Sequence, residues 1–176
     1  MKKEIIIVTD IWGMRNADWI DQYVLTLQRN YKVSILDSHK LGLIDATNLS
    51  EKVIHEQFVN GGIDRAVEQL IDQRPAVFAV IGFSIGGLIA WKACLQGFKT
   101  ETLIALSSTR LRYEKEKPNC NLFLIYGQED KFKPDENWFE VLNINHDIIM
   151  DQGHEVYKNS EIIPYLLQKI KSDNLV

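Results

Sequence analysis

A serine in this sequence is flanked by glycines in the pattern Gly-x-Ser-x-Gly, at residues 82–86. The apolar run Ala76–Ile81 precedes the pattern, and an apolar helical segment follows it. A serine in a sharp turn between a strand and a helix exposes its hydroxyl at the edge of the sheet, next to the helix N-terminus. Gly82 and Gly86 occupy the two positions where larger side chains would clash in such a turn. The pattern therefore predicts Ser84 as a candidate nucleophile.

A serine hydroxyl is a weak nucleophile unless a base accepts its proton, and the base needs a partner that orients it. Two later predicted strands are followed by residues that suit these roles, first an acid and then a histidine. The fifth predicted strand is followed by Gly127-Gln128-Glu129-Asp130, and the sixth by Asp151-Gln152-Gly153-His154. Because parallel strands end at the same edge of a sheet, Ser84, Asp130 and His154 are expected to converge there. The purely structural alternatives are an ordinary turn residue for Ser84, a solvated loop acid for Asp130 and a surface histidine for His154. Alternative acids are Glu129 and Asp151, and weaker candidates for the base are His39, His55 and His146.

Six short apolar runs rich in Ile, Val, Leu and Phe predict buried strands that would hold these residues. The runs are Glu4–Thr9, Lys32–Leu36, Ala76–Ile81, Glu101–Leu106, Asn121–Tyr126 and Asp147–Met150. Helical spacing between them predicts helices, among them Ile85–Leu95, with Trp91 in the core, and a last helix that begins at or just before Pro164. The segment 37–60 is less legible, with signs of a short helix near its end. This alternation predicts one α/β domain over residues 1–176, a doubly wound, mostly parallel six-stranded sheet flanked by helices.

Composition narrows the classes of function. The 176 residues are 45% hydrophobic and carry a formal net charge of −4, which gives no electrostatic basis for binding nucleic acid. The two cysteines, Cys94 and Cys120, do not make a disulfide framework. No metal-ligand spacing and no Gly-x-Gly-x-x-Gly after the first strand are present, so we predict neither a metal nor a cofactor. The apolar run near the N-terminus is too short for a signal peptide, and no segment is long enough to span a membrane; we therefore expect a cytoplasmic protein without a membrane partner.

Over essentially its whole length, the sequence resembles the α/β-hydrolases, in a small form without a large cap domain. Residues 82–87 resemble the nucleophile elbow of that family, residues 127–130 its Gly-x-x-Asp acid turn, and Gly153-His154 its Gly-His turn. The resemblance implies Ser84 as nucleophile, His154 as general base and Asp130 as the orienting acid. It also implies an oxyanion hole of two backbone N–H groups. These belong to Ile85 and to Trp12, in a loop where Asp10-Ile11 replaces the usual His-Gly.

Together these features predict a serine hydrolase that cleaves a small ester or thioester through an acyl-enzyme on Ser84. Two alternatives remain open. The chain could be a non-catalytic binding protein of the same fold, in which the altered loop spoils the oxyanion hole, or an acyltransferase that uses the same three residues. The segment Ser107–Pro118 is too short for a cap, which predicts a shallow pocket. Candidate substrate contacts are Phe83, Tyr113, Arg15, Arg110 and Arg112, and the arginines favour an anionic small-molecule substrate. The sequence identifies neither the acyl group nor the oligomeric state.

Overall fold

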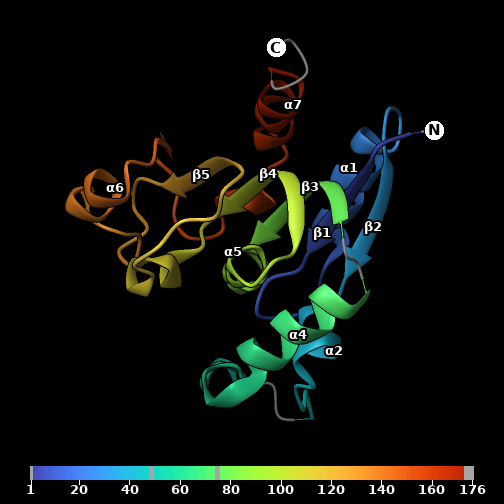
Figure 1. Cartoon of the computed structure of the whole chain (residues 1–176), viewed down its shortest axis with the longest axis vertical. Helices are drawn as coiled ribbons and strands as arrows, with labels where there is room; N and C mark the ends of the chain where they lie inside the picture. The colour runs from blue at the N-terminus through green and yellow to red at the C-terminus, as the bar shows by residue number, and fades with distance from the viewer. Residues whose placement is uncertain (1, 48–49, 74–75, 173–176) are drawn as a thin grey trace.

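The computed structural model describes residues 2–47, 50–73 and 76–172, and within them six parallel strands form one sheet in the order β2-β1-β3-β4-β5-β6 (Figure 1). The strands are β1 Glu4–Val8, β2 Lys32–Leu36, β3 Ala76–Phe83, β4 Lys99–Leu106, β5 Asn121–Gly127 and β6 His146–Ile149. Each coincides with a predicted apolar run to within two residues at either end. The predicted doubly wound α/β class is thus confirmed, with every described strand pair parallel.

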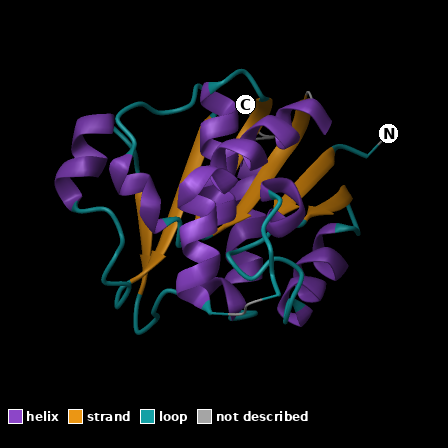
Figure 2. Ribbon diagram, turned by 90° about the horizontal axis from the view of Figure 1, so that it is seen from below, coloured by secondary structure: helices purple, strands orange, loops and turns teal. Residues whose placement is uncertain are grey.

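Helices cover both faces of this sheet (Figure 2). They are α1 Asp18–Leu27, α2 Ser38–Gly42, α3 Glu51–Gln57, α4 Ile63–Gln73, α5 Ile85–Leu95, α6 Glu136–Leu142 and α7 Ile162–Ser172, with the short helical turns η1 Phe58–Gly62, η2 Thr109–Tyr113 and η3 Val156–Lys158. Along β1, Ile5 and Ile7 pack with α1 and α7, whereas Ile6 and Val8 pack with α4 and α5. Burial on both faces explains why the strands are continuous apolar runs and do not alternate with polar residues. None of the described helices combines the length and apolarity needed to cross a bilayer.

Helix α5 is the central helix of one face and starts directly after Ser84. It packs against β3, β4 and α4, which leaves almost none of its surface in contact with solvent. The Trp91 ring is fully buried, and its indole N–H donates to the Glu116 carbonyl at 3.2 Å. The prediction of an all-round apolar helix with Trp91 in the core is therefore confirmed.

The segment that follows β2 was hard to interpret because its helices are short and broken. The Asp37 carboxylate caps α2 by accepting from the His39 N–H at 2.9 Å. The chain then continues through α3 and a kink at Asn60 and Gly61 into α4. The short helix predicted near residues 53–58 corresponds to the end of α3 and the start of this kinked connection.

Candidate active site

Ser84 occupies a strained turn between β3 and α5. Its backbone has φ 50° and ψ −113°, in a region that residues other than glycine rarely adopt. The Ser84 N–H donates to the Leu106 carbonyl at 2.8 Å, which ties the turn to β4. A Cβ on Gly82 would stand 2.7 Å from the Gly86 carbonyl carbon, and a Cβ on Gly86 would stand 2.8 Å from the Val8 carbonyl carbon. Because real Cβ atoms do not approach so closely, the tight turn requires glycine at both positions.

The loops after β5 and β6 lie directly against each other at the same edge of the sheet. The Gln128 N–H donates to the Ile149 carbonyl, and the Glu129 N–H donates to the Gln152 carbonyl, both at 2.9 Å. Gly127 makes this contact possible, since a Cβ there would stand 2.6 Å from the Gln152 carbonyl carbon. The contact brings the side chains that follow on each loop, Asp130 and His154, within reach of one another.

Ser84, His154 and Asp130 form a continuous chain of hydrogen bonds. Ser84 Oγ lies 3.0 Å from His154 Nε2, and His154 Nδ1 lies 2.8 Å from Asp130 Oδ2. A carboxylate oxygen can only accept, so Nδ1 carries the ring hydrogen and the lone pair of Nε2 faces the serine hydroxyl. The Asp130 side chain is 1% exposed and that of His154 is 39% exposed. This arrangement suits removal of the serine proton by the imidazole.

The loop that carries Asp130 is held by further hydrogen bonds. The Phe132 N–H donates to Asp130 Oδ1 at 3.1 Å, so both oxygens of the buried carboxylate have partners. The Lys133 ammonium donates to the Gln128 carbonyl at 2.9 Å and to the Asp130 carbonyl at 3.3 Å. These bonds keep the acid in one orientation toward the imidazole, as a residue that must orient a base requires.

The alternative residues lie elsewhere. Glu129 and Asp151 are exposed, and the carboxylate that reaches the imidazole is that of Asp130. The other histidines are His39, whose Nε2 contacts the Ile11 carbonyl, His55, which lies on the surface of α3, and His146, which stacks on Phe139 at the start of β6. Among the described residues, no three His, Cys, Asp or Glu side chains are placed together to hold a metal ion.

The turn after β1 is built around the buried side chain of Asp10. Its Oδ1 accepts from the Trp12 N–H at 3.0 Å, and its Oδ2 accepts from the Tyr157 hydroxyl at 3.1 Å. Burial raises the pKa of Asp10, and these two hydrogen bonds partly oppose that effect. The N–H predicted as an oxyanion donor is therefore already bonded within its own turn, and the expectation for Trp12 conflicts with this bond. This role of Asp10 was not predicted, although an aspartate that accepts from the N–H two residues on is a known turn signal in a sequence.

Helix α2 anchors the same turn from the other side. The Ser38 hydroxyl donates to the Asp10 carbonyl, and His39 Nε2 donates to the Ile11 carbonyl, both at 2.6 Å. The turn is thus fixed by contacts from β2–α2 and from Tyr157, which are far apart in the sequence. The other predicted donor, the Ile85 N–H, is the first of α5, and an N–H at that position has no partner within its own helix. Its oxyanion role stays a prediction.

Phe83 was predicted to form part of the pocket wall, and this prediction is wrong. Its ring is fully buried and packs against Trp19, Tyr23 and Tyr157 at centroid distances of 4.7, 5.0 and 5.3 Å. Successive side chains of a strand point to opposite faces. Phe83 therefore points into the core under α1 and α7, where no substrate reaches it.

Three of the remaining predicted contacts gather on η2. Arg112 and Arg110 lie 4.4 and 5.1 Å from the ring centroid of Tyr113, which is 59% exposed. Arg112 donates to the Thr109 carbonyl at 2.8 Å and to the Phe132 carbonyl at 3.1 Å, so it links η2 to the acid loop.

Arg110 Nε is buried and makes no hydrogen bond within the described part of the chain. Arg110 also lines a cavity of about 190 Å³, the walls of which are Val59, Ile63, Asp64, Leu88, Lys92, Tyr113 and Glu114. Arg15 is exposed in the turn before α1.

Comparison with known proteins identifies the fold. A scan against protein-family models finds no match, and neither does a comparison with curated proteins. Among solved structures, the chain is similar to a putative hydrolase of the α/β superfamily from Xanthomonas campestris pv. campestris, with 17% identity, a TM-score of 0.59, and 96% of this chain and 99% of that chain covered. It is also similar to a dienelactone hydrolase-like promiscuous phosphotriesterase from metagenomic libraries (12% identity, TM-score 0.71, coverage 97% and 86%). A third similar structure is the monoacylglycerol lipase of Paleococcus ferrophilus (14% identity, TM-score 0.62, coverage 96% and 94%). The chain thus has the α/β-hydrolase fold, as the resemblance in its motifs predicted.

Proposed function

We propose that this protein is a serine hydrolase that cleaves a small ester or thioester through an acyl-enzyme on Ser84. The main support is the chain of hydrogen bonds from Ser84 Oγ through the imidazole of His154 to the Asp130 carboxylate. The position of Ser84 between β3 and the N-terminus of α5 adds to it, because that position presents the hydroxyl at the edge where open α/β sheets bind ligands. Structural neighbours described as a hydrolase, a lipase and a phosphotriesterase favour hydrolysis in general.

The reaction would follow from this geometry. Ser84 Oγ attacks the carbonyl carbon of the substrate while His154 Nε2 accepts its proton. Asp130 holds the ring and stabilises the imidazolium that forms. The negative charge on the carbonyl oxygen is stabilised by the Ile85 N–H, at the positive end of the α5 dipole. The imidazolium then returns the proton to the leaving alcohol or thiol, and a water molecule activated by the same Nε2 releases the acid.

The substrate would extend from Ser84 toward η2, where Arg110, Tyr113 and Leu88 of α5 line a cavity that does not itself include Ser84, Asp130 or His154. Arg110 and Lys92 place positive charge at this cavity and favour an anionic group on the substrate, whereas Asp64 and Glu114 at the same cavity oppose it. Arg112 is engaged with backbone carbonyls, so its role would be to hold η2 in place. Arg110→Ala should therefore raise KM for an anionic ester and leave KM for a neutral ester unchanged. An equal rise for both esters would count against an anionic substrate.

One observation favours a second candidate, a binding protein of hydrolase fold without catalysis. The hydrogen bond from the Trp12 N–H to Asp10 removes the second donor expected for the oxyanion hole. Loss of one such donor typically lowers kcat by about 10²–10³-fold. A protein of this kind would keep the three side chains and react slowly or not at all.

A fluorophosphonate probe, which reacts with an activated serine, tests the proposal. We expect the wild-type protein to be labelled, and Ser84→Ala and His154→Gln to lose labelling. Ser160→Ala, which replaces an exposed serine at the end of the η3 loop, is the matched control and should label like the wild type. Circular dichroism of each variant checks that it is folded. Absence of labelling in the folded wild type would favour the binding protein. Release of free acid from p-nitrophenyl esters, measured with and without an added alcohol or thiol acceptor, then separates hydrolysis from acyl transfer.

A further inference from the structure

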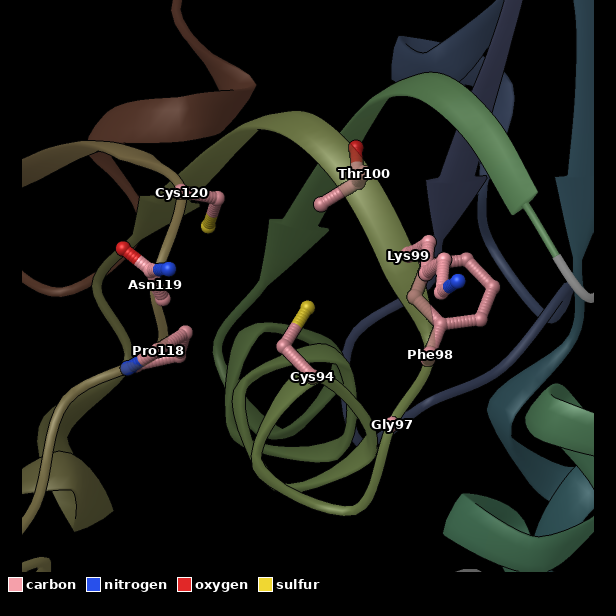
Figure 3. A pocket seen from close by; sticks show the side chains of 8 residues that line it. All are labelled: Cys94, Gly97, Phe98, Lys99, Thr100, Pro118, Asn119 and Cys120. Atoms are coloured by element: carbon pink, nitrogen blue, oxygen red, sulfur yellow. The ribbon is translucent and has the colours of Figure 1, made fainter.

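Two cysteines meet at the edge of the sheet opposite Ser84. Cys94 lies in the last turn of α5, and Cys120 directly precedes β5. Both line a cavity of about 250 Å³, and the other residues around it are Gly97, Phe98, Lys99, Thr100, Pro118 and Asn119 (Figure 3). Figure 3 shows the two sulfur atoms pointing into the same space between α5 and the start of β5. Each cysteine is half-buried, so a small molecule that enters the cavity can reach the thiols.

The two thiols interact with each other and are not equivalent. Hydrogen bonding with the Cys94 thiol and with the Leu103 N–H lowers the pKa of Cys120 below its usual range, and burial opposes this shift. The same contact and burial raise the pKa of Cys94. The thiolate is the reactive form of cysteine, so Cys120 is the first of the pair to attack an electrophile.

We propose that Cys94 and Cys120 form a dithiol site that small disulfides oxidise to an intramolecular disulfide. The Cys120 thiolate attacks one sulfur of a low-molecular-weight disulfide, which forms a mixed disulfide and releases one small thiol. Cys94 then loses its proton and attacks Cys120 Sγ, which forms the Cys94–Cys120 bond and releases the second small thiol. The protein loses two protons and two electrons, and the small disulfide gains them as it becomes two thiols. Lys99, exposed at the rim of the cavity, favours an anionic disulfide such as glutathione disulfide.

The new bond would join two elements that carry parts of the candidate active site. It would link the C-terminal end of α5, which begins after Ser84, to the start of β5, which leads to Asp130. It would close a loop that contains β4 and η2. A cross-link that closes a loop of this length restricts the unfolded chain, so the oxidised protein should be more stable than the reduced one.

The test uses the full chain incubated with glutathione disulfide, then blocked at free thiols and mapped by mass spectrometry. We expect a Cys94–Cys120 cross-linked peptide, a rise in Tm of roughly 5–10 °C, and reversal of both by dithiothreitol. In Cys94→Ser a mixed disulfide should accumulate on Cys120, because no second thiol resolves it. In Cys120→Ser no intramolecular cross-link can form, and the expected product is a mixed disulfide on Cys94.

Three results would overturn the proposal: a lasting mixed disulfide on the wild-type protein, disulfides only between two chains, or no reaction. The wild-type cross-link decides the question even if a single-cysteine variant does not fold. Ser84→Ala should form the disulfide as the wild type does. This variant separates the thiol chemistry from the proposed hydrolase function.

Discussion

Replacement of Gly127 by alanine tests whether the contact between the loops after β5 and β6 sets the geometry of Asp130 and His154. The new Cβ would stand 2.6 Å from the Gln152 carbonyl carbon, and closer still to the carbonyl oxygens of Gln152 and Gly153. Real Cβ contacts stay beyond 3.0 Å, and the atoms in the way are backbone atoms that cannot rotate aside. The loop that carries His154 must therefore move outward by roughly 1 Å, and a displacement of that size at a catalytic group lowers the rate by about 10²-fold.

The assay is the second-order rate of fluorophosphonate labelling, together with kcat/KM for a p-nitrophenyl ester. Gly153→Ala is the matched control, because a Cβ at Gly153 would meet no atom within 4 Å although the residue adjoins His154. It should keep the wild-type rate. Overpacking should destabilise Gly127→Ala by about 1–3 kcal/mol, so urea unfolding must show that the variant is folded under the assay conditions. A wild-type rate in folded Gly127→Ala, or an equal loss in Gly153→Ala, would refute the reasoning.

Three further changes probe the acid, the turn after β1 and the core. Asp130→Asn should lower the rate of fluorophosphonate labelling by about 10⁴-fold, because an amide at this position favours the wrong tautomer of His154. Glu129→Gln should leave the labelling rate unchanged. The reverse pattern would assign the orienting acid to Glu129. Burial raises the pKa of Asp10, so the folded wild type loses stability relative to the unfolded chain as pH rises through that folded-state pKa. Asp10→Asn removes this titration and keeps an acceptor for the Trp12 N–H. The free energy of unfolding of Asp10→Asn, measured in urea, should therefore rise relative to that of the wild type as pH increases. A difference between the two proteins that does not change with pH would contradict the prediction. Trp91→Ala should lower the free energy of unfolding by about 3–5 kcal/mol, since the ring is fully buried; a loss below about 1 kcal/mol in urea unfolding would show that the ring is not part of the packed core.

The sheet was predictable because its signals are local. A strand buried on both faces must be apolar at consecutive positions, and β1, β3 and β5 show this directly in the sequence. Helix α5 was equally clear, since a helix covered on all sides is apolar on all sides. The segment with α2 and α3 was not predictable in the same way. Its position depends on hydrogen bonds from Ser38 and His39 to the turn after β1, about thirty residues earlier.

The orientation of individual side chains was also beyond local reasoning. Phe83 adjoins the predicted nucleophile, yet strand geometry points its ring into the core between β3 and α1. The direction of this ring depends on which face of the sheet α1 and α7 cover, and residue types in a short motif do not contain that information. The Trp12 N–H is a different case, because its hydrogen bond to the Asp10 carboxylate is a local turn signal that the sequence does contain.

For the site, the glycine spacing around Ser84 and the order of serine, acid and histidine along the strand ends were enough to name the three candidate side chains. The resemblance to the α/β-hydrolases already implied Asp130 over Glu129 and Asp151. The folded chain gives the physical reason for this choice, because Gly127 lets two loops touch and the Asp130 carboxylate lies 2.8 Å from the imidazole. Ser84 and His154 are 70 residues apart in the chain. A turn depends on contiguous residues, whereas a hydrogen bond across that separation depends on how every intervening element packs.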